Sequence, residues 1–386
     1  MLVPVNRTLY KINCDPNNCS INWIAAKFLF EFEAVLKQIA KKVFVALKSG
    51  VRSIDSAPVS LTPTELHNVD LSQISPYFKL SKDSFCNKSV VRISRTQRTI
   101  KIEFHKAFLS PKRFEILFAR LLMVLQAYSP GVSKILDHSD KTAGRACFYL
   151  NLADTGSKDI RSISPDGNYY AFSRQDRHLD VGLIPDPYSL SDLANERAFV
   201  PYDDKNLARS AYQKRSSLVF WRGSTTGGPD SVDIHLNQRI RFCIDALKYK
   251  ESIDAKITNV VQFLSNKTAF KALTAAGVMG PMVTEAEFAK YKATMDLKGN
   301  SSAWGTLRKH LNLIHVIKPA SKDVLFYNIG QAAETFTGVE SIDEFFQKLR
   351  LDPSLIDNFE TAWRGYLYAL EVRKKMAAGD ATVFPV

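Results

Sequence analysis

The sequence has no long apolar segment of the kind that crosses a membrane or directs export. Its first residues lack a basic stretch followed by an apolar core, so we expect no signal peptide. The most apolar stretch, residues 23–47, is interrupted by six charged side chains and does not suit a bilayer span. Its apolar positions recur at helical spacing, which predicts an amphipathic helix packed on its own domain or lying on an anionic membrane surface.

Cysteine is also scarce, and no Cys-x-x-Cys pair occurs. The five cysteines are an odd number, so the dense disulfide framework of small secreted domains is excluded. Cys14 and Cys19 flank a short turn and could pair, but a reducing cytoplasm fits the composition best.

The familiar metal and nucleotide motifs are missing as well. No Asp-x-Asp sequence occurs, and the seven histidines show no ligand spacing, so we expect no metal and no bound cofactor. The patterns Gly-x-x-x-x-Gly-Lys-Ser/Thr and Gly-x-Gly-x-x-Gly are absent too. A P-loop kinase and a dehydrogenase are therefore unsupported.

Acidic residues are too few to balance the basic ones, and the net charge is +13. This excess predicts an anionic partner, such as phosphate-bearing substrates or an acidic membrane surface. The basic residues are dispersed and form no run of five or six, so we do not expect a nucleic-acid-binding tail.

Short apolar runs alternate with helical patterns in the second half of the chain. We predict strands at about 217–221, 291–297 and 313–317, and helices from about 233 and over 306–311, 341–349 and 355–378. Such alternation predicts an α/β fold with a parallel sheet. In the first half, strands are predicted at 100–104 and 146–152, and the second would deliver Asp154 into a loop.

A chain of 386 residues exceeds one average domain, so we expect two lobes. Residues 155–215 are rich in turn signals, and we place the boundary near their end. The predicted N-terminal lobe covers 1–205 and the C-terminal lobe covers 206–360. A C-terminal helix and tail over 361–386 are interpreted as packing back on the first lobe.

A Gly/Ser/Thr-rich turn, Trp221 to Gly227, follows the predicted strand at 217–221 and precedes a helix. Its backbone N–H groups and hydroxyls can converge on an anion, and the guanidinium of Arg222 suits phosphate oxygens. The competing interpretation is an ordinary turn with a surface arginine.

A second turn of this kind follows the predicted strand at 291–297. It runs from Lys298 to Gly305 and precedes a helix that carries Arg308. Two such turns, each beside basic residues, predict a crevice for a nucleotide diphosphate. Within it, Trp304 could stack on a base or simply pack.

The order of these motifs resembles glycosyltransferase family 90, the capsule-associated and lipopolysaccharide-modifying glycosyltransferases related to the protein O-glucosyltransferases. The clearest similarity covers about 205–350 and rests on residues 220–227, Arg239, 291–292, 296–300 and 318–319. A weaker similarity reaches back to 151–154, 172–174, Asp180 and 184–185.

The resemblance implies a GT-B-like fold, in which two Rossmann-like lobes face each other across a cleft. It also implies a metal-independent, inverting enzyme that moves a sugar, glucose or xylose, from a UDP-sugar to a hydroxyl of a surface glycan. Lipopolysaccharide core, capsule or a lipid-linked glycan would be the acceptor. The chain lacks the disulfides and retention tail of secreted members, so we expect a bacterial-type cytoplasmic enzyme held peripherally on the anionic inner membrane.

Family positions can be carried over residue by residue. The predicted donor-binding residues are Arg222, Gly223, Ser224, Thr225, Arg239, Gly299, Asn300, Trp304 and Arg308. A structural salt bridge is the alternative for Arg222, and an ion pair with Asp245 is the alternative for Arg239. Lys298 departs from the Asp or Arg that many members carry, which leaves the sugar open.

An inverting enzyme needs one general base to deprotonate the acceptor hydroxyl. The resemblance implies that Asp154 serves, because it follows a strand of the N-terminal lobe as the family base does. A helix cap or turn is the structural alternative for Asp154, and Asp180 or Asp186 are the other candidates for the base. A second hypothesis for the whole chain is an inactive GT-B-like protein or a basic module that binds anionic glycan or nucleic acid.

Overall fold

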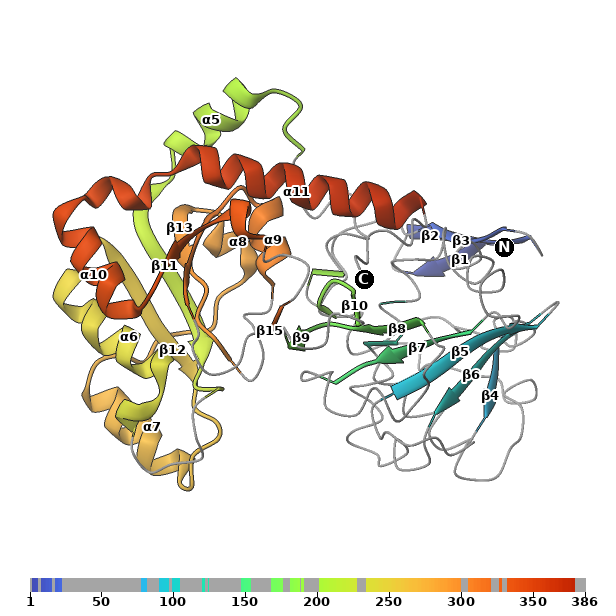
Figure 1. Ribbon diagram of the computed structural model, residues 1–386, viewed down its shortest axis with the longest axis horizontal. Coiled ribbons are helices and arrows are strands. Elements are labelled where there is room, and N and C mark those ends of the chain that lie inside the picture. The colour runs from blue at the N-terminus through green and yellow to red at the C-terminus, as the bar shows by residue number, and fades with distance from the viewer. Residues whose placement is uncertain are drawn as a thin grey trace. The chain divides into compact units, whose positions relative to one another are not determined.

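The computed structural model describes residues 2–5, 8–15, 18–22, 78–81, 90–96, 99–104, 120–121, 124, 147–153, 168–175, 181–187, 189–190, 201–227, 234–299, 305–320, 326–327 and 332–378. The chain divides into two compact units (Figure 1). The N-terminal unit comprises 1–198 with 372–386, and the C-terminal unit comprises Phe199–Glu371. The helix predicted within 23–47 lies outside the described residues.

The C-terminal unit is built on a sheet of five parallel strands. In chain order these are β11 (Ser216–Ser224), β12 (Ile253–Asn259), β13 (Tyr291–Met295), β14 (His315–Pro319) and β16 (Phe336–Val339). Their spatial order is β12-β11-β13-β14-β16. The chain therefore moves outward from β11 to β12 and returns to β13 on the other side. This confirms the predicted α/β fold with a parallel sheet and creates a topological switch point between β11 and β13.

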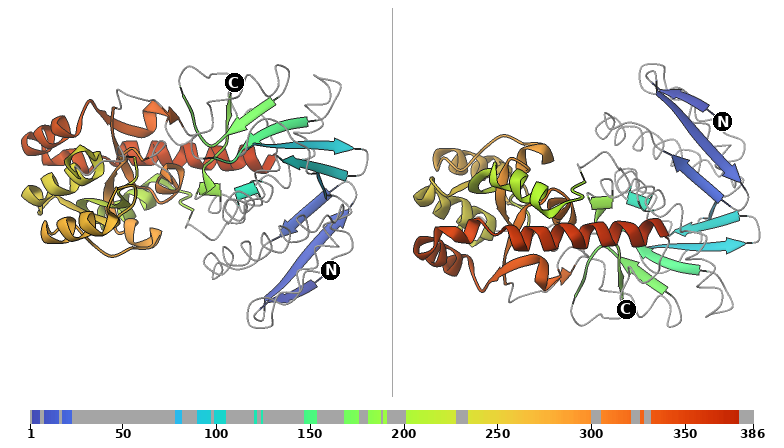
Figure 2. Two further views of the ribbon diagram at one scale, coloured as in Figure 1. Left: turned by 90° about the horizontal axis from the view of Figure 1, so that it is seen from below. Right: turned by 90° about the horizontal axis from the view of Figure 1, so that it is seen from above.

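Helices cover both faces of this sheet (Figure 1). The described helices of the unit are α5 (Lys205–Gln213), α6 (Gln238–Ala246), α7 (Asn266–Ala275), α8 (Glu285–Phe288), α9 (Thr306–Leu311), α10 (Ile342–Leu351) and α11 (Phe359–Ala378), which runs past Glu371. In Figure 2, α11 is one long, uninterrupted rod. The predicted helix near 233 begins later, at Gln238, because the side chain of Asn237 accepts hydrogen bonds from the N–H groups of Arg239 and Ile240 and so caps it.

Alternate residues of β11 build the two halves of the core. Val219 and Trp221 pack with α6, α7 and α10 in the larger hydrophobic cluster. Phe220 points to the other face and packs with Phe288 and Ile314. Because successive strand residues face opposite sides, Arg222 is on the same face as Phe220, and its guanidinium lies 4.3 Å from the centre of that ring.

The N-terminal unit contains a six-stranded sheet in the order β10-β8-β7-β5-β6-β4. Its strands are β4 (Phe78–Ser81), β5 (Val90–Thr96), β6 (Thr99–Phe104), β7 (Cys147–Asn151), β8 (Asn168–Ala171) and β10 (Gly182–Leu183). The strands predicted at 100–104 and 146–152 are confirmed as β6 and β7. This sheet is mixed, since β5 is antiparallel to both β6 and β7. Only two residues separate β5 from β6, and so short a link makes a hairpin.

Three further strands, β1 (Leu2–Val5), β2 (Thr8–Asp15) and β3 (Asn18–Asn22), form an antiparallel sheet in the N-terminal unit. Cys14 and Cys19 are register partners in β2 and β3. None of the helices in the described part of the chain combines the length and apolar character needed to cross a bilayer.

His315 is a buried titratable group at the start of β14. Its Nδ1 lies 3.2 Å from the carbonyl oxygen of Ile356, and its Nε2 lies 2.7 Å from the hydroxyl of Thr337. Since a carbonyl can only accept, Nδ1 carries the proton of the neutral ring and Nε2 accepts from Thr337. Burial lowers the pKa of His315 from 6.5 to about 4.

This histidine should make the protein sensitive to mild acid. Between pH 6.5 and 4 the unfolded chain binds a proton at His315 that the folded chain does not, so acid favours unfolding. We expect the free energy of unfolding to fall by about 3 kcal/mol from this group as the pH drops from 7 to 4. Urea unfolding of wild type and His315→Gln measures it, because the variant should lose much of that slope. The exposed His235→Gln is the control, and an equal slope in His315→Gln would contradict the assignment.

Candidate functional site

The carboxyl ends of β11 and β13 lie beside each other and continue into the two turns predicted to bind phosphate. β11 runs into Thr225–Gly227, and β13 runs into Asp296–Gly299. In open α/β sheets, ligands bind in the crevice outside the carboxyl ends of the strands at the switch point. The two turns therefore lie at the edge of the sheet where a ligand site is expected, and we call them the β11 loop and the β13 loop.

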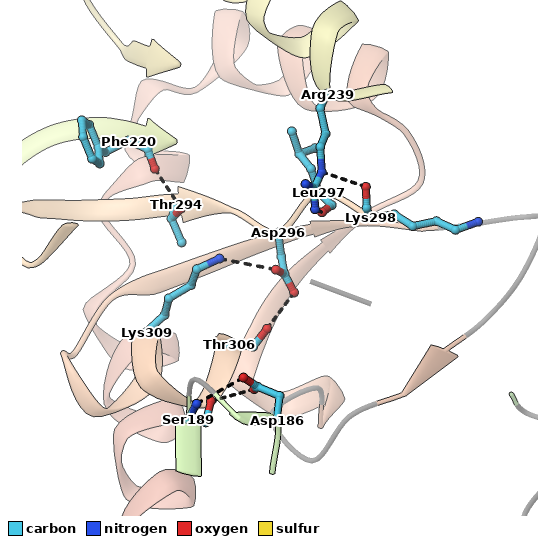
Figure 3. Close-up of polar contacts among 10 residues, drawn as sticks. All are labelled: Asp186, Ser189, Phe220, Arg239, Thr294, Asp296, Leu297, Lys298, Thr306 and Lys309. Carbon is cyan, nitrogen blue, oxygen red and sulfur yellow. Dashed lines mark hydrogen bonds and ion pairs between the residues drawn. The ribbon is translucent and has the colours of Figure 1, made fainter. Parts of the chain in front are cut away.

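Arg239, in the first turn of α6, joins these two loops, and Figure 3 shows its contacts with the β13 loop. Toward the β11 loop, its Nη1 donates to the carbonyl oxygen of Ser224 at 3.0 Å and to the hydroxyl of Thr226 at 2.7 Å. Toward the β13 loop, its Nη2 donates to the carbonyl of Leu297 and its Nε to that of Lys298, both at 3.0 Å. Four of its five N–H donors are thus used, and every acceptor is neutral.

Two glycines let the loops approach each other. Gly227 has φ +86°, and a Cβ there would lie 2.3 Å from the carbonyl oxygen of Gly299. A Cβ on Gly299 would lie 2.7 Å from Nη2 of Arg239. A side chain at either position would push the loops or the guanidinium away, so both glycines are required by the contact between the loops.

The β13 loop also offers backbone donors. Its carbonyl groups at Leu297 and Lys298 are turned toward Arg239. The N–H groups of Leu297, Lys298 and Gly299 donate to no other group within the described ranges. Successive N–H groups after a strand are the type of donor that binds phosphate oxygens. Orientation of the carbonyls by Arg239 therefore leaves the amides available for an anion.

Asp296 is a buried carboxylate at the end of β13 that sequence reasoning did not select. Its side chain is 1% exposed. Thr306, the first residue of α9, donates its hydroxyl to Oδ2 at 3.1 Å, and Nζ of Lys309 lies 3.5 Å from Oδ1 (Figure 3). The carboxylate thereby ties β13 to the start of α9. Its position as the first residue of the β13 loop, directly after a buried strand, is the signal by which the sequence could have pointed to it.

The charge of Arg239 is poorly compensated by hydrogen-bonded partners. Burial lowers its pKa to about 10, while the carboxylate of Asp296 acts in the opposite direction. No carboxylate among the described residues accepts a hydrogen bond from the guanidinium. A phosphate bound between the loops would supply the missing negative charge, which favours an anion at this edge.

Arg222 is oriented differently from the sequence prediction. Its Nη2 forms an ion pair with Oδ2 of Asp254 at 2.9 Å, and its Nη1 donates to the carbonyl groups of Trp221 and Asp254. The guanidinium lies over the ring of Phe220, and the Arg222 side chain is 10% exposed. The structure therefore favours the structural salt bridge, the alternative to a diphosphate contact. Alternation along β11 places Arg222 on the same face of the sheet as Phe220, whose register partner in β12 is Asp254.

The other predicted donor residues at the end of β11 and in the β11 loop have mainly structural contacts. Thr225 is 1% exposed, and its hydroxyl donates to the carbonyl of Val261 and accepts from the N–H of Val261. A Cβ on Gly223 would lie 2.6 Å from the ring of Trp221, so glycine is needed there for packing. Ser224 lies closer to the candidate site, since its hydroxyl is 3.3 Å from that of Thr226. Thr226 was not among the predicted donor-binding residues, and its hydroxyl accepts a hydrogen bond from Arg239.

The alternatives for the remaining cations are partly resolved. Arg239 does not pair with Asp245, whose carboxylate instead binds Lys248 at 3.1 Å. Arg308 lies in α9, the helix predicted to carry it, and is half-buried. Asn300 and Trp304 lie outside the described residues.

The predicted general base, Asp154, also lies outside the described residues, as does its alternative Asp180. Asp186 is described and is 2% exposed. Its two carboxylate oxygens accept from the N–H and the hydroxyl of Ser189, the geometry of a helix cap. This arrangement favours a structural role for Asp186.

Comparison with family models and with curated proteins identified no relative of this chain. No protein-family model matches the sequence, and a search of curated proteins gave no significant match. The functional interpretation therefore rests on the described residues and on the motif order.

Proposed function

We propose that this protein is a metal-independent, inverting glycosyltransferase that moves glucose or xylose from a UDP-sugar to a hydroxyl of a surface glycan. The proposal includes a GT-B arrangement, with the C-terminal unit as the donor lobe and the N-terminal unit as the acceptor lobe. Lipopolysaccharide core, capsule or a lipid-linked glycan is the proposed acceptor, and the net charge of +13 suits an anionic inner-membrane surface. The order of motifs, which resembles glycosyltransferase family 90, supplies the reaction class.

One observation carries the donor assignment. Arg239 is buried, has no hydrogen-bonded carboxylate among the described residues, and holds together two glycine-bearing loops at the switch point of a parallel sheet. Such a site suits a ligand with two adjacent negative groups, because each loop can contribute donors to one of them. A nucleotide diphosphate has this charge distribution.

The chemistry of the leaving group follows from the same residues. When the sugar–phosphate bond breaks, negative charge grows on the departing UDP, and donors fixed in advance stabilise it most effectively. The N–H groups of the β13 loop, the remaining N–H of Arg239 and the hydroxyl of Ser224 are the donors proposed for this task. The hydrogen bond between Thr306 and Asp296 fixes the start of α9 against the β13 loop, so both are proposed as positioning residues.

We assign the acceptor chemistry to Asp154. In the sequence it follows the last residue of β7, Asn151, by three positions, and β7 pairs in parallel with β8. As a general base, its carboxylate takes the proton of the acceptor hydroxyl while that oxygen attacks the anomeric carbon from the side opposite UDP. The new glycosidic bond forms as the bond to the UDP oxygen breaks, which inverts the configuration.

The test is a titration of UDP into wild type and Asp154→Asn, followed by a transfer assay with UDP-glucose and UDP-xylose. We expect UDP to bind both proteins with affinities within about twofold and to stabilise them by about 2.7 kcal/mol at a hundredfold excess over Kd. EDTA should not change the affinity. Transfer by Asp154→Asn should fall about 10²–10⁴-fold, the usual contribution of a general base.

Each outcome separates the parts of this proposal. Absence of UDP binding to wild type would contradict the donor assignment. Binding of UDP without transfer to any glycan acceptor would favour an inactive binding module, the alternative for the whole chain. Full transfer by Asp154→Asn would place the base elsewhere.

A further inference from the structure

The C-terminal unit has a concave site at the edge of its sheet opposite the two loops. This cavity has a volume of about 460 Å³ and is lined by Tyr202, Ala211, Lys214, Arg215, Ala289, Lys290, Leu311 and Asn312. Lys214 and Arg215 immediately precede β11, and Ala289 and Lys290 immediately precede β13. The cavity therefore lies at the amino ends of the strands, and we call it the amino-edge pocket.

Three connections between helices and strands form its walls. They run from α5 to β11, from α8 to β13 and from α9 to β14. Arg215 links the first to the third, because its Nη1 donates to the carbonyl groups of Asn312 and Leu313 at 2.7 and 2.9 Å. The first is joined to the second by a hydrogen bond from the N–H of Ser216 to the carbonyl of Lys290 at 2.9 Å. The backbones of all three walls are thus tied to one another.

The lining is strongly cationic. Lys214, Arg215 and Lys290 contribute three positive charges, and no carboxylate is among the lining residues. Lys290 pairs with Glu287 at 2.7 Å, outside the lining. Neither Lys214 nor Arg215 has an ion pair with a carboxylate in the part of the chain that the structure describes. With Glu287 counted against the three cations, a net charge of +2 remains, which matches the charge of a dianion.

Capping explains only part of this charge. Arg215 satisfies carbonyl groups at the end of α9, and Lys214 follows the last turn of α5, where a cation is favoured by the helix dipole. Neither function requires a cavity or a third cation from the β13 connection. Tyr202, Ala211 and Leu311 add apolar surface beside the charges, as in sites for small polar molecules.

We propose that the amino-edge pocket binds the phosphoryl group of a small soluble molecule, at a site separate from the donor loops. A phosphomonoester is nearly a dianion at neutral pH and matches the excess charge better than one carboxylate does. Arginine and lysine together suit phosphate, since the guanidinium fork fixes its orientation and the ammonium groups add charge. The volume leaves room for a small organic group next to the phosphate.

The test is a site-resolved titration of the full chain by NMR, with inorganic phosphate and glycerol 3-phosphate as probes. We expect saturable shifts at the backbone amides of Lys214, Arg215, Lys290 and Asn312. The phosphate ester should bind at least as tightly as inorganic phosphate because it also contacts the apolar wall. Amides of the β11 and β13 loops report binding at the donor site independently, so the two proposals fail separately.

A charge-matched pair of double variants decides whether binding is specific. Lys214→Gln with Lys290→Gln should weaken phosphate binding at the pocket amides at least tenfold. Lys267→Gln with Lys271→Gln removes the same charge from the exposed surface of α7 and should change it less than twofold. Equal weakening in both pairs, or shifts at the pocket amides that do not saturate with either probe, would overturn the proposal.

Discussion

Arg239→Met is expected to weaken UDP binding at least 100-fold, the largest effect on donor affinity that we predict for a single side chain. The substitution removes a charge-assisted donor beside the proposed diphosphate and leaves the carbonyl groups of Ser224, Leu297 and Lys298 without their donor. Loss of those partners should also reduce the free energy of unfolding by about 2–4 kcal/mol. Calorimetric titration with UDP and urea unfolding measure the two effects.

Arg239→Lys separates position from charge. Lysine keeps the cation but cannot reach both loops with a planar fork, so we expect a loss of about tenfold in UDP affinity. If Arg239→Lys binds UDP as tightly as wild type, charge alone is sufficient, and the proposal that Arg239 must bond to both loops is contradicted.

Arg222→Met is the matched control. Arg222 is also an arginine of low exposure close to the β11 loop, but its guanidinium pairs with Asp254. Arg222→Met should therefore lower the free energy of unfolding by about as much as Arg239→Met, while its UDP affinity stays within about threefold of wild type. If Arg222→Met loses UDP affinity as strongly as Arg239→Met, the side chain of Arg222 contacts the donor after all and its assignment to a structural role is wrong.

Gly227→Ala is expected to reduce both stability and UDP affinity, because it disrupts the contact between the loops. The new Cβ would be strained at φ +86° and would lie 2.3 Å from the carbonyl oxygen of Gly299. We expect a loss of about 3 kcal/mol in the free energy of unfolding, from backbone strain together with overpacking. UDP affinity should fall as well, because the loops must separate.

Gly277→Ala provides a control with the same backbone conformation and no contact. Gly277 has φ +72°, and nothing lies within 4 Å of its added Cβ. Only the left-handed strain remains, so we expect a loss of about 1 kcal/mol. Urea unfolding compares the variants, and equal losses would mean that the loops do not press on each other at Gly227.

Much of the C-terminal unit was predictable because its signals are local. Apolar runs of strand length predicted β11, β13 and β14, and helical spacing predicted α9, α10 and α11 to within a few residues. The start of α6 was misplaced, since the capping residue is Asn237 and not a residue near 233. Both candidate loops were recognisable because glycine and hydroxyl residues directly follow buried strands.

The roles of the two arginines were not predictable in the same way. Arg222 stands inside the most suggestive motif, yet β11 turns it toward Asp254 on the neighbouring strand. Arg239 could be assigned either to the donor or to Asp245, and it bonds instead to backbone carbonyls about 15 and 58 residues away. Asp296 escaped selection because its partners belong to α9, across the β13 loop.

The sequence by itself determined a parallel α/β unit with two glycine-bearing loops after buried strands, because hydrophobic periodicity and turn chemistry act over a few residues. Only the tertiary structure decided that these loops meet, that Arg239 joins them, and that Arg222 serves the sheet. The physical reason is that strand order and register bring together groups far apart in the chain. The partner of a charged side chain depends on the distance between the two groups in space, and the spacing of residues along the sequence does not give that distance.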